Sequence, residues 1–262
     1  MTLTLPGPPA LPRDRAGIGR ISLFLDFDGT LVDIATRHDG VVVDAALRRL
    51  VALLAARLDG RLAVVSGRPV AEIAAYLHVG AAQPPPFAIA GSHGLELQWP
   101  DGRRQAPPAP AGLEAARAAF EALAERCPGV VVEPKPFGVA LHFRQAPEAE
   151  AACIALASDV AQQAGLFIQH GKMVCELRAP GADKGDALHH FLSAPLMAGT
   201  LPFFAGDDLT DEAGFVAAEA LGGAGILVGP PRPTAARYGL AGVAAVHAWL
   251  SPLADRCLED AT

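Results

Sequence analysis

The stretch Ile21-Ser-Leu-Phe-Leu-Asp-Phe-Asp-Gly-Thr-Leu31 begins as an apolar run typical of a buried strand and then breaks into two aspartates separated by one phenylalanine. Side chains two apart in a strand share a face, so Asp26 and Asp28 point the same way while Phe27 points elsewhere. Two neighbouring carboxylates repel, so one can stay ionised and attack while the other holds a proton to donate. Gly29 permits a tight turn whose amides can face a phosphate. A solvated aspartate pair in an Asx turn is the alternative interpretation.

The composition limits which partners and compartments fit the chain. With 262 residues, 51% of them hydrophobic, the chain can form one large core or a core with a smaller companion domain. The formal net charge of −7, without any lysine or arginine run, argues against a nucleic-acid partner or a polybasic membrane patch. No apolar run reaches the roughly 18 residues that span a bilayer, and the N-terminus has no secretory signal pattern. We therefore expect a soluble, cytoplasmic protein, and we favour a monomer. We expect its cysteines to stay reduced because they form no Cys-x-x-Cys pair; they are Cys127, Cys153, Cys175 and Cys257.

The order of strand-like and helical patterns predicts an α/β fold with an insertion. Buried-strand runs such as ISLFLD, LAVVS, FAIAG, LPFFAG and GILVG alternate with helical patterns, which indicates a Rossmann-like parallel sheet with crossover helices. Between them, helical patterns over residues 111–126 and 147–164 are each followed by two strand-like runs, which predicts a smaller α+β cap domain. We expect residues 1–20 to be a mobile arm outside the core, residues 21–99 and 180–262 to form the discontinuous core, and residues 100–179 to form the cap.

Three further polar motifs accompany the apolar strands of the predicted core. Ser66 ends the run LAVVS, Lys184 lies in Gly-Ala-Asp-Lys-Gly-Asp, and Asp207 and Asp208 follow LPFFAG. Taken singly, Ser66 is as consistent with a helix N-cap, and Lys184 with an exposed first-turn lysine. Open α/β sheets bind ligands at the carboxyl ends of their strands, so the set together indicates a site at that edge.

The aspartates at these strand ends form a candidate metal site. Mg²⁺ prefers oxygen ligands and is usually held by one or two carboxylates together with a substrate phosphate, which suits this set better than Zn²⁺. The candidate ligands are Asp26, Asp28, Asp207 and Asp208. Asp208 can be a direct ligand or a supporting group, as can Asp211, and the acidic turn can simply cap the next helix through Thr210, Asp211 and Glu212.

In this order, the motifs Asp-Phe-Asp-Gly-Thr-Leu, Ser66, Lys184 and Gly-Asp-Asp-Leu-Thr-Asp-Glu resemble those of the haloacid dehalogenase superfamily of phosphotransferases. The resemblance implies an enzyme in which Asp26 attacks phosphorus and forms an acyl-phosphate, while Asp28 protonates the leaving alcohol and later activates water. It implies that Ser66, Lys184 and Mg²⁺ offset the charge of the transferring group. It also implies phosphate contacts from the residues around the first two strand ends: Gly29, Thr30 and Gly67.

The cap strands alternate charged and apolar residues. Along residues 132–144 and 173–178 this alternation predicts a sheet with one polar and one apolar face. The alternative interpretation is that the polar face is an ordinary solvent-exposed face without a binding role. Four segments, SGRP, AGSHGLE, EPKPFGVALHFR and GKMVCELR, resemble the motifs of the trehalose-6-phosphate phosphatase family. The resemblance covers nearly all of the chain from Ile21 to about Leu250. The chain departs from that pattern at Phe143, where a tyrosine is expected, and the role of His142 stays open. The substrate-binding residues that the resemblance implies are Glu133, Lys135, Arg144 and Glu176 in the cap, and Arg68 and His93 at the core-side entrance.

The resemblance implies a phosphatase that hydrolyses trehalose 6-phosphate to trehalose and phosphate, the last step of trehalose biosynthesis. It also implies that the cap closes over the site, with hinges at residues 100–110 and 179–182. A phosphatase of sucrose 6-phosphate or a hexose phosphate shares every core motif and stays open as an alternative. A non-catalytic sugar-phosphate-binding module would have lost the nucleophile, lysine or metal carboxylates, all of which are present. A dinucleotide-binding oxidoreductase is excluded because no Gly-x-Gly-x-x-Gly follows the first strand.

Overall fold

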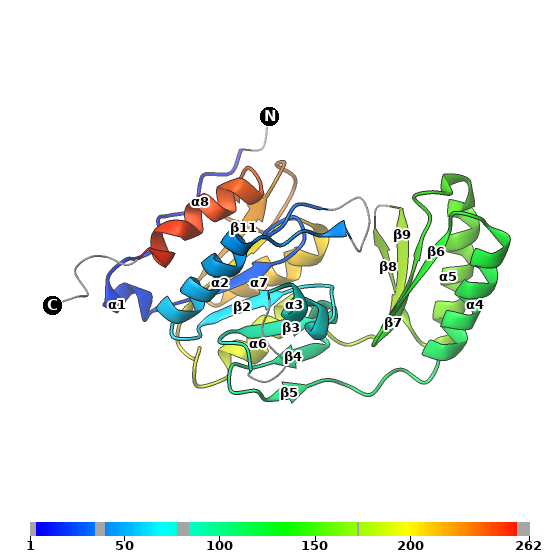
Figure 1. The fold of residues 1–262 in the computed structure, drawn as a ribbon, viewed down its shortest axis with the longest axis horizontal. Helices are drawn as coiled ribbons and strands as arrows, with labels where there is room; N and C mark the ends of the chain where they lie inside the picture. Colours follow the sequence, from blue (N-terminus) through cyan, green and yellow to red (C-terminus); the bar gives the residue numbers. More distant parts are fainter. Residues whose placement is uncertain (1–3, 35–39, 78–83, 172, 256–262) are drawn as a thin grey trace. The chain divides into compact units, whose positions relative to one another are not determined.

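The computed structural model describes residues 4–34, 40–77, 84–171 and 173–255, so Cys257 lies outside the described residues. The chain divides into two compact units: Met1–Ala106 with Ala182–Thr262, and Pro107–Gly181. Figure 1 shows the elements of each unit, coloured along the sequence. Within the described ranges, no helix combines the length and the apolar character that crossing a bilayer requires.

The first unit is built on an eight-stranded sheet with the order β12-β11-β10-β1-β2-β3-β4-β5. The strands from β12 to β3 run parallel, β4 pairs antiparallel with β3, and β5 pairs antiparallel with β4. The strands are β1 Ile21–Asp26, β2 Leu62–Val65, β3 Ala88–Gly91, β4 Glu96–Gln98, β5 Arg104–Gln105, β10 Leu201–Gly206, β11 Ala224–Val228 and β12 Tyr238–Leu240. This arrangement confirms the predicted α/β class.

Helices cover both faces of this sheet. They are α1 Arg15–Ile18, α2 Ala45–Arg57, α3 Val70–Tyr76, α6 Lys184–Leu192, α7 Glu212–Ala220 and α8 Val243–Ala254, with short 3₁₀ turns η2 Ser92–Gly94 and η4 Leu209–Asp211. Leu23 and Leu25 of β1 pack in one hydrophobic cluster with α2, α3 and α8, and Phe24 packs in the other cluster with α6 and α7. Because β1 is buried on both faces, its sequence is mostly apolar, with Ser22 buried among the hydrophobic residues.

The core sheet extends into the proline-rich stretch that the sequence analysis assigns to the cap. Trp99 and Arg103 close a tight turn in which the Trp99 amide donates to the Arg103 carbonyl at 2.9 Å, and Gly102 adopts φ +85. The turn lets β5 pair with β4, so these residues belong to the first unit. Short two-residue strands and a turn carry little periodicity, which is why the sequence pattern does not reveal them.

The N-terminal segment differs from the expected arm in the part that the structure describes. Leu11 and Ile18 are buried members of the core cluster that contains β1. The Trp249 indole donates to the Pro9 carbonyl at 2.9 Å, and the Gly239 amide donates to the Pro6 carbonyl at 2.9 Å. Proline and glycine here shape a segment that contacts α8 and β12, and the expectation of a segment outside the core is wrong for Leu11 and Ile18.

The second unit is the predicted α+β cap. Its antiparallel sheet has the order β6-β7-β9-β8, and two long helices cover one face. Figure 1 shows α4 and α5 side by side, and they pack together through their buried side chains. The elements are α4 Leu113–Arg126, β6 Val131–Lys135, β7 Gly138–His142, the 3₁₀ turn η3 Pro147–Ala149, α5 Glu150–Ala164, β8 Phe167–Gly171 and β9 Val174–Arg178.

Candidate active site

The topology brings three predicted motifs to one edge of the core sheet. The strands β10, β1 and β2 are parallel neighbours, so their carboxyl ends meet. Asp26 is the last residue of β1, Ser66 follows β2, and Asp207 follows β10. The buried first turn of α6 adds Lys184 to the same place, because its ammonium contacts Asp26.

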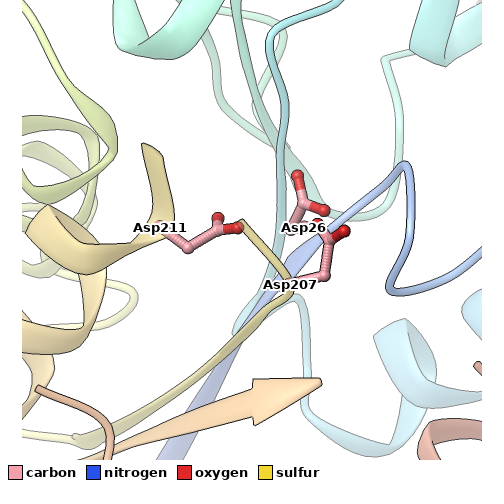
Figure 2. Close-up of side chains that lie close together, drawn as sticks. All are labelled: Asp26, Asp207 and Asp211. Atoms are coloured by element: carbon pink, nitrogen blue, oxygen red, sulfur yellow. The ribbon is translucent and has the colours of Figure 1, made fainter. Parts of the chain in front are cut away.

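Figure 2 shows the carboxylates of Asp26, Asp207 and Asp211 converging, and one oxygen of each lies within 4.8 Å of the others. The ammonium of Lys184 donates to Asp26 Oδ1 at 2.8 Å and to Asp211 Oδ1 at 2.6 Å. Asp26, Asp211 and Lys184 are all buried, so these ion pairs are shielded from solvent. Lys184 therefore acts as a fixed positive charge between two carboxylates.

Burial of several carboxylates in one place perturbs their protonation. Burial raises the pKa of Asp26 well above its ordinary value; Lys184 opposes this shift, while Asp211 and Asp207 add to it. Burial, with repulsion from Asp211 and Asp208, raises the pKa of Asp207 to about 7. Burial opposes the charge of Lys184, but Asp211 and Asp26 outweigh it, so its pKa is raised above the usual lysine value. Three carboxylates against one ammonium leave a net negative charge that favours a cation.

The acidic cluster fits a hard divalent cation. Asp26 Oδ2 is buried and has no hydrogen-bond partner among the described residues. Both oxygens of Asp211 are in use, since Oδ1 accepts from Lys184 and Oδ2 accepts from the Asp208 amide at 3.0 Å. Asp26 and Asp207 are therefore the better candidate ligands, with Asp211 orienting Lys184. A donor set made only of oxygen atoms suits Mg²⁺.

The turn after the first aspartate requires glycine. Gly29 adopts φ +81, and a Cβ built at this position would lie 2.2 Å from Asp207 Oδ2. A side chain here would displace the carboxylate from the cluster. The next residue, Thr30, is fully buried, and its hydroxyl has no hydrogen-bond partner among the described residues. This turn brings the backbone close to the acidic cluster, and phosphate binding by the turn stays a prediction.

The loop after β2 carries Ser66, Gly67 and Arg68. Ser66 is buried, and its hydroxyl accepts from the Arg68 amide at 3.1 Å. His93, which has a left-handed backbone with φ +56, lies over Gly67, where a Cβ would be 2.5 Å from the ring Nε2. The carboxylate of Glu96 accepts from the Ser92 hydroxyl at 2.7 Å, and this contact ties the histidine turn to β4. No local sequence pattern identifies Glu96 as a structural support of this loop.

Asp28 does not join the carboxylate cluster. Its two oxygens accept from Arg68, Oδ2 from Nε at 2.6 Å and Oδ1 from Nη2 at 2.9 Å. The third donor group of the guanidinium, Nη1, is paired with Glu72 on α3. The side chain predicted as a metal ligand is thus held by an arginine instead, and the Glu72 partner is a residue that the sequence analysis misses.

In the acidic turn after Asp207, some residues reach the carboxylate cluster and others make local capping contacts. Asp208 caps η4, where its carboxylate accepts from the amide and hydroxyl of Thr210 at 2.7 and 2.6 Å. Glu212 pairs with Arg232 and accepts from the Ala235 amide at 2.8 Å. Burial opposes the charge of Glu212, but these hydrogen bonds lower its pKa. The sequence is compatible with Asp208 and Asp211 as either metal ligands or helix caps. Of these two residues, only Asp211 lies in the carboxylate cluster.

The polar face of the cap sheet is an ion-pair network. Lys135 pairs with Glu176 across the central strand β7, and it lies 4.0 Å from Glu133. His142 Nε2 is 2.7 Å from Glu133, which gives that histidine a hydrogen-bonding role. Arg144 lies beyond the end of β7 in an exposed turn, because the Ala146 amide returns to the carbonyl of Phe143 and ends the strand.

Two further polar residues lie on this face. The strand register places Gln169 beside Glu176, and Arg178 beside Gly138. Arg178 Nε donates to Gln169 Oε1 at 3.2 Å, and the guanidinium lies 5.0 Å from the ring centroid of Phe167. The alternation of β8 puts Phe167 and Gln169 on the polar face, and the alternation of β9 puts Glu176 and Arg178 there.

A separate cavity of about 650 Å³ lies at the opposite edge of the core sheet. Its lining includes Asp59, Gly60, Trp99, Arg103 and Leu196. It adjoins the amino end of β2, and it contains none of the predicted site residues that the structure describes. The carboxylate and lysine cluster is therefore the better candidate for the chemistry.

The fold and the acidic edge define the class. A haloacid dehalogenase-like hydrolase from Bacteroides thetaiotaomicron matches the fold with a TM-score of 0.59 at 15% identity, covering 88% of this chain and 98% of that chain. The protein has the haloacid dehalogenase-like hydrolase fold, with a cap inserted in a parallel-sheet core.

Sequence comparison narrows the class to one family. The trehalose-phosphatase family matches residues 24–243. A probable trehalose-phosphate phosphatase from Sinorhizobium fredii is 40% identical over 83% of this chain and 81% of that protein. The trehalose-6-phosphate phosphatase of Escherichia coli is 37% identical over 87% of this chain and 84% of that protein. The chain belongs to the trehalose-phosphatase family.

Proposed function

We propose that the protein is a Mg²⁺-dependent phosphatase that hydrolyses trehalose 6-phosphate to trehalose and phosphate, the last step of trehalose synthesis. The observation that carries the proposal is the buried ammonium of Lys184 between Asp26 and Asp211, next to Asp207 at the carboxyl edge of the sheet. Family membership supports the substrate class.

In the first half of the reaction, Asp26 attacks phosphorus and an aspartyl-phosphate forms as the bond from phosphorus to the sugar oxygen breaks. Asp28 gives its proton to that oxygen, so the sugar leaves as a neutral alcohol. Lys184 offsets negative charge on the nucleophile and on the transferring group. The buried hydroxyls of Ser66 and Thr30 support phosphate binding by offering donors beside the cluster.

In the second half, Asp28 accepts a proton from a water molecule that attacks the aspartyl-phosphate, and phosphate leaves with Asp26 restored. The oxygen ligands suited to Mg²⁺ are Asp26 and Asp207, and the bound ion would supply positive charge for the phosphate oxygens. Asp211 keeps Lys184 in place during both halves, because it holds the ammonium at 2.6 Å.

The cap residues supply the sugar specificity in this proposal. Glu133, Lys135 and Glu176 form a charged set whose donors and acceptors match the hydroxyl groups of a disaccharide. Arg144 adds an exposed guanidinium at the end of β7. In the first unit, the residues proposed to bind the substrate are Arg68 and His93.

Phosphate release from a substrate panel tests the proposal. The panel contains trehalose 6-phosphate, sucrose 6-phosphate, glucose 6-phosphate and p-nitrophenyl phosphate, each with Mg²⁺ and with a chelator. We expect the highest kcat/KM with trehalose 6-phosphate and loss of turnover in the chelator. Equal rates with all four esters would contradict the assigned substrate, and full activity in the chelator would contradict the metal requirement.

A further inference from the structure

Phe27, the residue between the two aspartates, is part of an aromatic site for an arginine. Its ring stacks with Tyr76 of α3 at a centroid distance of 5.6 Å. The guanidinium carbon of Arg68 lies 6.0 Å from the centroid of Phe27 and 5.4 Å from that of Tyr76. An aromatic face attracts a cation, so the two rings favour one position of the guanidinium.

The donors of this guanidinium are divided between two carboxylates. Nε and Nη2 of Arg68 hold both oxygens of Asp28 at 2.6 and 2.9 Å, and Nη1 is paired with Glu72. A two-pronged arginine contact fixes the plane of a carboxylate as well as its position. The orientation of Asp28 therefore depends on how Arg68 is held.

Glu72 is itself held in place from α3. It lies four residues after Arg68 and pairs with it, and burial together with Glu72 raises the pKa of the nearby Tyr76 hydroxyl. The carbonyl of Tyr76 in turn accepts from Arg48 of α2 at 3.0 Å. A continuous chain of contacts thus runs from the helix layer to the carboxylate beside the nucleophile.

An ordinary helix-surface ion pair is the competing explanation, and the cap contains one for comparison. Arg117 and Glu121 of α4 are also four residues apart, with Nε 2.8 Å from Oε1. The side chains of that pair are 45% and 50% exposed, whereas the Arg68 side chain is only 8% exposed and also grips Asp28. Burial and the second carboxylate distinguish the Arg68 pair from a surface pair.

We infer that Glu72 and Tyr76 are positioning residues for proton transfer, because they fix Arg68 and through it the carboxylate of Asp28. The inference rests on the proposed role of Asp28 as the proton donor. In that step the bond from phosphorus to the sugar oxygen breaks, and the proton of Asp28 moves to this oxygen. p-Nitrophenyl phosphate releases a stable phenolate that leaves without a proton, so its first step does not need a positioned acid.

The test measures the first half-reaction with both esters. Rapid quench gives trehalose release from trehalose 6-phosphate in a single turnover, and stopped flow gives the burst of p-nitrophenol. For Glu72→Ala we expect trehalose release to slow about 10- to 100-fold, no more than the lower end of what general acid catalysis contributes because Asp28 itself is retained, while the p-nitrophenol burst stays near the wild-type rate. Tyr76→Phe should show the same selectivity with a smaller loss, since Glu72 still holds Arg68.

If a thermal melt shows that Glu72→Ala does not fold, Glu72→Gln replaces it: the amide keeps one acceptor but loses the charge that pairs with Arg68, so we expect the same selectivity with a smaller loss. Glu121→Gln removes the charge of the matched surface pair and should leave both rates unchanged.

Asp28→Asn separates the inference from the proposed function. If Asp28→Asn slows only the sugar ester while the Glu72 variants slow both esters equally, or neither, the inference is wrong and the proposed function stands. If Asp28→Asn slows both esters equally, the proposed acid role of Asp28 is wrong, and the inference falls with it.

Discussion

In the proposed metal site, the carboxylate of Asp207 links metal binding to protonation. Burial raises its pKa from 3.8 to about 7 in the metal-free protein, so near neutral pH a proton competes with a cation for the same oxygens. We expect the affinity for Mg²⁺ to rise as the pH increases from 6 to 8, because a larger fraction of Asp207 is then ionised. Titration calorimetry across this pH range measures the affinity for Mg²⁺. An affinity that fell with rising pH would contradict this role of Asp207.

The same shift predicts that Asp207→Asn stabilises the metal-free protein while it removes the metal. A carboxyl whose pKa is raised by folding contributes stability below its ordinary pKa of 3.8, and this contribution is lost as the pH rises through about 7. At pH 8 the variant should therefore melt at a higher temperature without Mg²⁺ and gain no further stability from Mg²⁺. Asp208→Asn, which changes a capping residue, should keep the Mg²⁺-dependent increase. Loss of that increase in Asp208→Asn would show that Asp208 is a ligand.

Gly29→Ala is a second test at the residue scale. The variant combines left-handed backbone strain with a Cβ 2.2 Å from Asp207 Oδ2, so we expect it to abolish both Mg²⁺ binding and phosphate release. Gly199→Ala is the matched control, because Gly199 has φ +75 with open space around its Cβ position. The strain alone costs about 1 kcal/mol. A Gly29→Ala variant that kept wild-type Mg²⁺ affinity by calorimetry would contradict the tight approach to Asp207.

At the scale of elements, the hairpin of β3 and β4 supports the loop that carries Ser66 and Arg68. Glu96 of β4 accepts from the Ser92 hydroxyl at 2.7 Å and from the Val70 amide at the start of α3 at 3.3 Å. Glu96→Ala should lower the free energy of unfolding by about 1–3 kcal/mol and raise KM, since it leaves buried donors unpaired. Urea unfolding and steady-state kinetics measure both effects. Glu96→Gln keeps one acceptor and should lose less; equal losses in both variants would contradict this account.

The sequence predicts those elements whose pattern is local and repeated. The run Ile21–Leu25 is apolar because both faces of β1 are covered, so its burial is readable from the sequence. The pairing of β5 with β4 is not readable, because two residues after a turn carry no period. The pairing of Asp28 with Arg68 also escapes, since it joins residues 40 positions apart through side-chain geometry.

Among the site residues, those that follow strands are the predictable ones. Asp26, Ser66 and Asp207 are found from their positions because parallel strands share a carboxyl edge. Asp211 stays ambiguous in the sequence, where an acidic residue before a helix is also a common cap. Its contact with Lys184 depends on how α6 and α7 pack together, which no local pattern encodes.

At the scale of the whole molecule, the proposed function assigns the chemistry to one unit and the sugar specificity to the other. The first contains the acidic cluster, and the second contains the charged sheet face of Glu133, Lys135 and Glu176. We expect Lys135→Ala to lower kcat/KM for trehalose 6-phosphate about 10- to 100-fold, as for a lost hydrogen bond to a charged group, and to spare p-nitrophenyl phosphate. Steady-state kinetics with trehalose 6-phosphate and with p-nitrophenyl phosphate measures the two kcat/KM values. Glu121→Gln, on the surface of α4, should change neither value. An equal loss with both esters would contradict the division.

The central claim is that Asp26 becomes phosphorylated during turnover. The direct measurement is acid quench of the protein during reaction with trehalose 6-phosphate and Mg²⁺, followed by proteolysis and mass spectrometry. The account predicts one phosphoryl group on the peptide that contains Asp26, and its absence in Asp26→Asn, which should still fold and release no phosphate. A phosphoryl group on another residue, or wild-type phosphate release by Asp26→Asn, would contradict it.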